Sequence, residues 1–224
     1  YIIEVVMKSK KVNKLFNIII FILVVSISLI YGKQEIFKNS YSYKDDNKSS
    51  ISNNINSNLE IYFFDVGQAD SILIKSNDDT VLIDAGNRND GENLANYIKN
   101  DLKINDIDIV IGTHPHEDHI GGMNYIIDSF DIGKIYLPDV TSNAKFFEKL
   151  LDSIDSKDYK ISIPKIDEEI KLNNLVFNVL SVDDNDKNIN DCSIVLKLNY
   201  LDTKYLFMGD ASKSVEKKLL DKDI

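Results

Sequence analysis

Hydrophobic and polar positions divide the chain into three parts. An apolar run extends from Leu15 to Tyr31 and is broken by only three polar residues. Residues 33–58 are dominated by Asn, Ser and Lys and show no sustained hydrophobic period, which is typical of a linker. From Leu59 onward, short apolar runs alternate with turn residues and with stretches of helical period. We therefore expect an apolar segment over residues 1–32, a linker over residues 33–58 and a folded domain over residues 59–224.

The N-terminal segment has the pattern of a secretory signal or a signal anchor. Four lysines between residues 8 and 14 precede the apolar run. At roughly 17 residues, the run lies at the short end for a helix that spans a bilayer. Ser26 and Ser28 offer a weak cleavage site, and we favour an anchor over a cleaved signal. Because basic flanks stay on the cytoplasmic side, we expect the folded domain to be extracytoplasmic and membrane-anchored, or secreted if the segment is cleaved.

The folded domain is expected to mix strands and helices. Strands are predicted over residues 61–65, 71–75, 81–84, 108–112 and 134–137, and helices over 91–102, 120–130, a stretch capped by Ser142 and a stretch from about Ser212. Two hairpins are predicted, one from residues 169–172 and 175–181 around Asn173-Asn174, the other from 193–199 and 204–208 around Asp202-Thr203. This order predicts an α/β fold whose helices pack outside sheets.

Charge is distributed unevenly along the chain. The formal net charge is −10: residues 1–58 hold eight Lys and four Asp/Glu (+4), and the remainder holds 18 Lys/Arg and 32 Asp/Glu (−14). The acidic domain lacks a strong basic patch for nucleic acid, because phosphate binding requires clustered Lys and Arg. It does not exclude a phosphate substrate that is held by metal ions. Cys192 is the only cysteine, so no intramolecular disulfide can form.

The three histidines of the chain all fall within six residues, at positions 114, 116 and 119. They directly follow the predicted strand 108–112, and His114 and His116 alternate along an extended segment, so both side chains can point the same way. Asp118 and His119 arrive where the next helix is expected. Imidazole suits zinc, iron or manganese, and a neighbouring carboxylate adds a harder oxygen ligand. The cluster therefore predicts a metal site.

Five segments resemble the metallo-β-lactamase superfamily. They are His114-Pro115-His116-Glu117-Asp118-His119, Val81–Gly86, Leu206–Asp210, Phe64–Ser71 and Asn190–Val195. The last two are similar to the extracytoplasmic hydrolase domain of ComEC-type DNA-uptake (competence) proteins and their stand-alone relatives. The resemblance covers residues 59–224 and implies an αββα sandwich that holds two divalent metal ions, with zinc favoured and manganese as the alternative.

The resemblance also implies roles for individual residues. His114 and His116 would bind the first metal, Asp118 and His119 the second, and Asp210 would bridge them. Asp118 would in addition be the catalytic residue that handles the proton of the leaving group.

Residues around these ligands have weaker assignments. Asp84 would orient the histidine loop from behind, although it could be only a turn former, and Asp210 could be a helix cap rather than a ligand. Gln68 and Asp70 would lie at the rim of the site, as functional groups or as turn residues.

The sequence also departs from the superfamily pattern. A further histidine expected between the histidine loop and Asp210 is absent, and the ComEC-like Asn-x-x-Ser segment places Asn190 or Asp191 near that corner. Cys192 is a thiol ligand candidate or a small buried residue. A final histidine loop would follow the last helix, so we expect a truncated domain with an incomplete second half and an under-coordinated second metal.

Three functions are compatible with these residues. The first is a metal-dependent hydrolase that acts on phosphodiesters, small or polymeric, outside the cytoplasm. The second is a degenerate, non-catalytic metal-binding module. The third is a hydrolase of acyl bonds, such as a lactam or a thioester, because one fold hosts several chemistries. The sequence contains no region with several membrane spans, so we do not expect the chain itself to form a pore. The sequence does not determine the oligomeric state.

Overall fold

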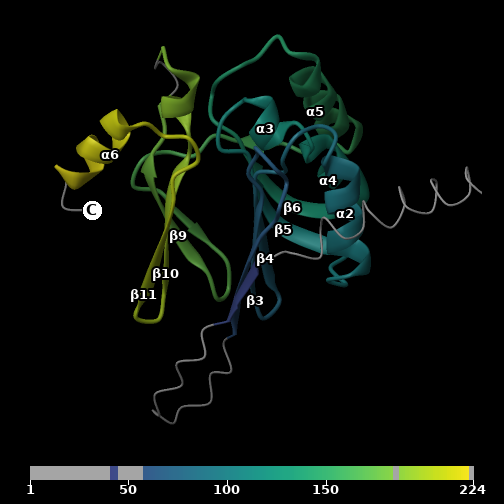
Figure 1. The fold of residues 1–224 in the computed structure, drawn as a ribbon, viewed down its shortest axis with the longest axis horizontal. Helices are drawn as coiled ribbons and strands as arrows, with labels where there is room; N and C mark the ends of the chain where they lie inside the picture. The colour runs from purple at the N-terminus through teal and green to yellow at the C-terminus, as the bar shows by residue number, and fades with distance from the viewer. Residues whose placement is uncertain (1–40, 45–57, 184–186, 222–224) are drawn as a thin grey trace, which may run out of the picture. The chain divides into compact units, whose positions relative to one another are not determined.

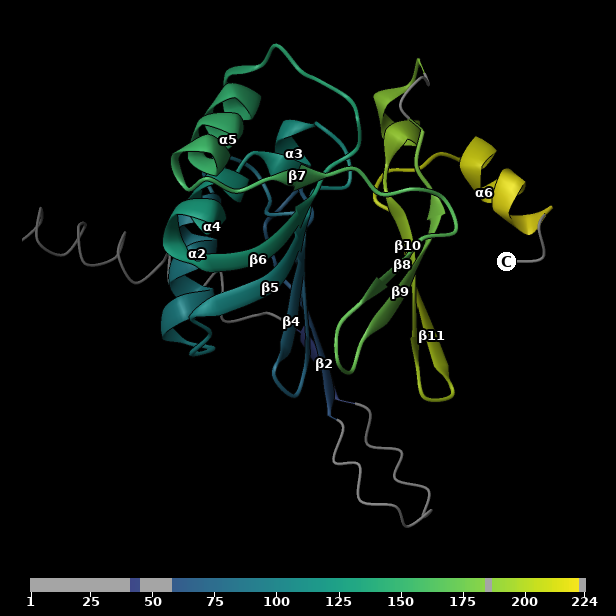
Figure 2. The ribbon, with the colours of Figure 1, turned by 180° about the vertical axis from the view of Figure 1, so that it is seen from behind.

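Two β-sheets face each other in the folded part of the chain, with helices on their outer sides (Figure 1, Figure 2). The computed structural model describes the backbone of residues 41–44 and all of residues 58–183 and 187–221. The predicted signal or anchor segment, residues 1–32, lies outside the described residues. Within the described ranges, no helix is sufficiently long and apolar to cross a membrane.

The first sheet is mixed and has seven strands in sequential order. They are β1 (Tyr41–Lys44), β2 (Leu59–Phe63), β3 (Ile72–Ser76), β4 (Asp79–Ile83), β5 (Asp106–Ile111), β6 (Asp131–Tyr136) and β7 (Ile161–Ser162). Strands β1 to β4 pair antiparallel, and β4 to β7 pair parallel. The inner strand β4 is buried at every position, as expected for a strand covered on both faces.

The second sheet has four antiparallel strands in the order β11-β10-β9-β8. They are β8 (Glu169–Lys171), β9 (Val176–Ser181), β10 (Val195–Tyr200) and β11 (Thr203–Phe207). A 3-10 turn, η1 (Ile189–Cys192), precedes β10. Asp79, at the start of β4, accepts hydrogen bonds from the Asn173 side chain and the Asn174 amide, so the turn of the β8–β9 hairpin is attached to the first sheet.

Helices cover both outer faces of the sandwich. The helices α2 (Gly91–Asn100), α4 (Met123–Ser129) and α5 (Lys145–Ser156) cover the seven-stranded sheet, and α3 (Glu117–Ile120) follows β5 (Figure 1). On the four-stranded sheet, α6 (Lys213–Leu220) packs Val215 and Leu219 against Leu180 and Val195. The layers therefore follow the order predicted by the resemblance, helix, sheet, sheet, helix.

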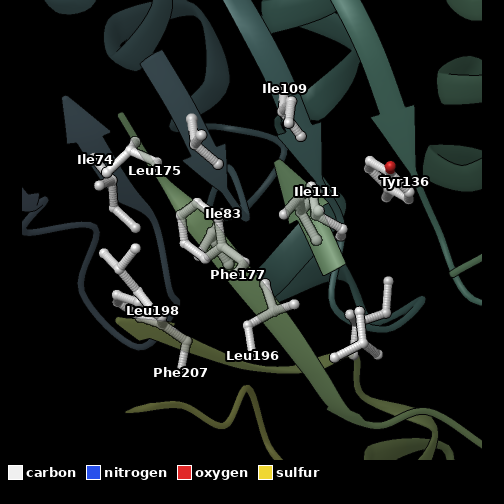
Figure 3. Packing of buried hydrophobic residues seen from close by; sticks show 14 of the residues in the cluster. Ile74, Ile83, Ile109, Ile111, Tyr136, Leu175, Phe177, Leu196, Leu198 and Phe207 are labelled. Carbon is white, nitrogen blue, oxygen red and sulfur yellow. The ribbon is translucent and has the colours of Figure 1, made fainter. Parts of the chain in front are cut away.

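The main core lies between the two sheets. Ile83 and Ile111 from the first sheet meet Phe177, Leu196 and Phe207 from the second in one hydrophobic cluster (Figure 3). Phe177, Ile111 and Leu196 are fully buried. Burying one such side chain contributes about 1.5–3 kcal/mol, so this cluster holds the two sheets together.

Several predicted boundaries differ from the structure. The helix expected over residues 120–130 is two helices, because the Gly122 amide bonds to the Gly86 carbonyl instead of continuing a helix. Ser142 is not the N-cap of α5: its hydroxyl accepts the Ala144 amide, and the helix begins at Lys145. Two short strands, β1 and β7, are not predicted from the sequence; β1 lies in the segment expected to be a linker.

Candidate metal centre

Three strand ends meet at the predicted site. Asp84 follows β4 and Thr113 follows β5; Ile83 and Ile111 are paired in register, so the two residues lie side by side at the same sheet edge. Gly209 and Asp210 follow β11 of the other sheet. Gly209 has a φ of +52°, and a Cβ there would lie 3.0 Å from both the Ser193 hydroxyl and the Thr113 Cβ. A glycine is therefore required where the two sheets approach each other at the site.

His114 is held by two hydroxyl groups. Thr113 Oγ1 lies 3.1 Å and Ser193 Oγ 3.3 Å from His114 Nδ1. Both hydroxyls donate their protons elsewhere, Thr113 to Asp84 at 2.7 Å and Ser193 to the Asn190 carbonyl at 2.7 Å. They can therefore only accept from His114, so Nδ1 carries the proton and Nε2 presents a lone pair. Nε2 lies 3.0 Å from Nδ1 of His116.

His119 is held by a buried carboxylate. Its Nδ1 lies 2.8 Å from Asp84 Oδ2, and its Nε2 lies 3.3 Å from Asp210 Oδ1. Asp84 also accepts from the Thr113 amide at 2.8 Å. Its φ of +58° shows that it is a turn residue as well, so one residue shapes the turn and fixes the orientation of His119.

Burial and neighbouring charges separate the pKa values of two of the histidines. Burial, together with His119 and His116, lowers the pKa of His114 to about 3. Burial would also lower the pKa of His119, but the hydrogen bond to Asp84 and the charges of Asp84, Asp210 and Asp70 raise it to about 9. His114 is therefore neutral at physiological pH, the state that binds metals, whereas a metal at His119 must displace a proton.

The donor atoms of these residues fit a divalent metal. Ligand atoms of His114, His119 and Asp210 lie within 4.8 Å of one another, and no other such group occurs among the described residues. Two ligands of one tetrahedral zinc ion are about 3.3 Å apart, given Zn–N bonds of about 2.0–2.1 Å. The separations of 3.0 Å between His114 and His116 and 3.3 Å between His119 and Asp210 match that spacing.

The other predicted site residues lie around this group. The Asp118 side chain is not among the grouped ligand atoms. Its backbone carbonyl accepts the Asp70 amide, which attaches the loop of residues 65–71 to the histidine loop. Burial and the negative charges of Asp84, Asp210 and Asp118 raise the pKa of Asp70, whereas His119 lowers it. The charged groups of the site therefore act on Asp70. Gln68 is exposed on the same loop.

The Asn-x-x-Ser segment lies behind His114. Ser193 contacts His114 directly, and Asn190 Oδ1 is buried without a hydrogen-bond partner in the described part of the chain. The Asp191 side chain faces Ser212 rather than the histidines. Cys192 is buried, its thiol lies 3.8 Å from the Asn188 carbonyl, and it does not join the ligand group. The alternative of a small buried residue therefore fits Cys192 better than that of a ligand.

Sequence reasoning missed Thr113. Its hydroxyl links Asp84 to His114 and its amide binds Asp84, so it connects the histidines to the turn after β4. Its position directly before the first histidine was the available signal.

The alternative of Asp210 as a helix cap is wrong, because the N-cap of α6 is Ser212, whose hydroxyl accepts the Ser214 amide.

An apolar cavity of about 190 Å³ adjoins the site. It lies where the ends of β2 to β4 approach β11, and its lining includes Phe63, Ile72, Tyr205, Leu206, Asp70 and Thr113. Phe63 and Leu206 are about half exposed, so the cavity is open to solvent.

Comparison with known families decides the assignment. The family model of the Metallo-beta-lactamase superfamily matches residues 64–224, which is most of the chain and all of the site. The chain belongs to the metallo-beta-lactamase superfamily. Members of this superfamily bind divalent metals, typically zinc or iron, and are usually metal-dependent hydrolases. The histidine loop, the turn with Asp84 and the strand end with Asp210 all lie within the matched residues.

Solved structures resemble the chain only distantly. A metallo-beta-lactamase from Cronobacter sakazakii, in a HARLDQ-motif mutant form, is 13% identical with a TM-score of 0.46, covering 66% of this chain and 60% of its own. The metallo-beta-lactamase fold protein YhfI from Bacillus subtilis is 16% identical with a TM-score of 0.44, covering 62% and 54%. CmlA, a diiron beta-hydroxylase from Streptomyces venezuelae, is 14% identical with a TM-score of 0.47, covering 72% and 32%. The matches thus span 60% or less of each of these proteins. No curated protein matches the chain.

Proposed function

We propose that this chain is a metal-dependent phosphodiesterase that holds two divalent metal ions and acts outside the cytoplasm. The observation that carries the proposal is the convergence of His114, His119 and Asp210, with His116 beside His114. The choice of a phosphodiester rests on the resemblance of residues 64–71 and 190–195 to the ComEC-type hydrolase domain. ComEC-like ancestry, membrane attachment and zinc as the preferred metal belong to the same proposal.

In this proposal the ligands divide between two metals. His114 and His116 would hold the first, His119 and Asp118 would hold the second, and Asp210 would be shared between them. When bound, the ions supply Lewis acidity and lower the pKa of coordinated water. Thr113 and Ser193 keep Nε2 of His114 available, and Asp84 aims His119.

Charge around the site explains why an anionic substrate requires the metals. Asp70, Asp84, Asp118 and Asp210 act on the same small region, as their effects on neighbouring pKa values indicate. Without cations these carboxylates repel a phosphodiester. Two divalent ions offset four negative charges, so we infer that binding and cleavage of the substrate both depend on metal.

The test is hydrolysis of bis(4-nitrophenyl) phosphate by the purified chain, with Zn²⁺ or Mn²⁺ added after chelation. We expect metal-dependent release of nitrophenolate, and the double variant His114→Ala plus His116→Ala should lose both the bound metal and the activity. Cleavage of a β-lactam or thioester without phosphodiester cleavage would replace the proposal by an acyl hydrolase. Metal binding without activity on either class would leave a metal-binding module.

The role of Asp118 is tested in the same assay. As a metal ligand that also handles the leaving-group proton, it should matter more for turnover than for retention of the first metal. We expect Asp118→Asn to lower kcat while elemental analysis still finds metal at His114 and His116. Full activity of this variant would remove the proton-transfer role.

A further inference from the structure

The Asp191 carboxylate is tied to the start of α6. Its Oδ1 accepts the Ser212 amide at 2.8 Å, and its Oδ2 accepts the hydroxyls of Ser212 and Ser214, each at 3.0 Å. Asp191 is only 6% exposed. Burial raises its pKa, but these hydrogen bonds, with one from Asn188, hold that pKa below its usual range. Asp191 is therefore a buried carboxylate that binds the segment from Ser212 to Ser214 through three hydrogen bonds.

The segment held by Asp191 begins two residues after Asp210. On its other side, the loop is fixed by Gly209, which packs against Thr113 and Ser193. Between these two points Asp210 is 41% exposed and has one described contact, the 3.3 Å approach to His119 Nε2. The loop itself contributes a bond from the Ala211 amide to the Met208 carbonyl. The position of the Asp210 carboxylate thus depends on where the two ends of its loop are held.

The turn that carries Asp191 also serves the other half of the site. Ser193, two residues later, contacts His114 Nδ1, and both residues flank the end of η1. A single turn therefore contacts both His114 and the loop that carries Asp210. Ser212 itself caps the helix by accepting the Ser214 amide, whereas Asp191 accepts the amide and hydroxyl of Ser212 and so fixes the position of the cap residue next to the Asp210 loop.

We propose that Asp191 is a positioning residue that sets Asp210 for the second metal by holding the Ser212 end of its loop. The inference rests on the proposed function, because it presumes that Asp210 and His119 take up a metal. Asp191 is not among the grouped ligand atoms of the site. It acts through Ser212, as partners behind a metal ligand commonly do, and removing such a partner weakens metal affinity by about 10- to 100-fold.

The experiment titrates the metal-free chain of residues 1–224 with Co²⁺, whose visible absorption reports coordination. We expect the parent to bind two equivalents. Asp191→Ala should bind the first like the parent and the second about 10- to 100-fold more weakly. Asp191→Asn, which keeps the acceptor for the Ser212 amide, should recover part of this loss. The matched control is Val215→Ala, which loosens the packing of α6 on the sheet but leaves the Asp191 bonds intact; it should retain the parent affinity.

A second readout does not require metal. Hydrogen–deuterium exchange of residues 208–214 in the metal-free chain should accelerate in Asp191→Ala and not in Val215→Ala. Unchanged exchange in Asp191→Ala would overturn the inference, and so would two equivalents bound with parent affinity. Equal loss of the second equivalent in Val215→Ala would also overturn it, because general docking of α6 would then explain the effect. A parent chain that binds only one equivalent would overturn this inference, and one that binds no metal would overturn the proposed function with it.

Discussion

Asp84 combines two tasks that usually fall to separate residues. Its backbone takes a left-handed conformation that ends β4, and its buried carboxylate receives three hydrogen bonds from Thr113 and His119. The family resemblance implied that Asp84 would orient the histidine loop, with a turn former as the alternative. It could not predict that Thr113 completes the link to His114, because this depends on the register of β4 and β5.

The first prediction at the scale of residues concerns Asp84. Asp84→Asn retains the shape but places an amide donor among partners that also donate. We expect metal affinity to fall by about 10- to 100-fold and the free energy of unfolding to fall by about 1–3 kcal/mol. Competition with a chromophoric chelator and urea denaturation measure the two effects. The control Asp78→Asn, at an exposed turn, should match the parent, and parent-like metal affinity in Asp84→Asn would contradict the orienting role.

At the scale of elements, the hydrophobic pattern and the turn residues predicted most strands of the core. Strand β5 and the hairpins β8–β9 and β10–β11 lie where they were predicted, with boundaries shifted by a few residues. Short elements that depend on partners were not predictable: β7 has two residues and exists because it pairs with β6. The second hairpin turns at Leu201, with φ of +50°, an unfavourable choice that only the strand pairing explains.

The turn of the β8–β9 hairpin shows how tertiary contacts replace turn propensity. Asn173-Asn174 was predicted to be the turn because asparagine tolerates positive φ, yet neither residue is among those with positive φ. Instead, both donate hydrogen bonds to the buried Asp79 at the start of β4. The asparagines therefore attach one sheet to the other.

This attachment gives a prediction about stability. Asp79→Ala removes both bonds and leaves the Asn174 amide without its acceptor, so we expect the free energy of unfolding to fall by about 1–3 kcal/mol in urea denaturation. The matched control is Asp202→Ala at the exposed turn of the other hairpin, which should change stability by less than about 0.5 kcal/mol. Equal effects of the two substitutions would mean that the Asp79 bonds do not join the sheets.

At the scale of the whole molecule, the site is assembled from segments far apart in the sequence. The histidine loop, the turn at Asp84 and the Asp210 loop come from two sheets, and the core between these sheets sets their distance. The motifs pointed to His114, His119 and Asp210 from the sequence, and the fold brings ligand atoms of these three residues within 4.8 Å of one another. Residues expected near these ligands, such as Asp191, were only approximately placed, because the sequence does not reveal which side of a turn faces the histidines.

The last prediction concerns the position of the domain relative to a membrane. Residues 1–58 carry a net charge of +4 and the remainder −14, and the lysines between residues 8 and 14 precede the apolar run. Because basic flanks remain on the cytoplasmic side, a reporter fused after residue 224 should be extracytoplasmic and should sediment with membranes. Alkaline phosphatase activity in intact cells, compared with a cytoplasmic reporter fused at the same site, measures the location of the domain.

Replacing the four lysines by glutamine should lower the exported fraction without changing expression. Quantitative release into the medium would indicate a cleaved signal in place of an anchor, and a reporter active only in the cytoplasm would contradict both.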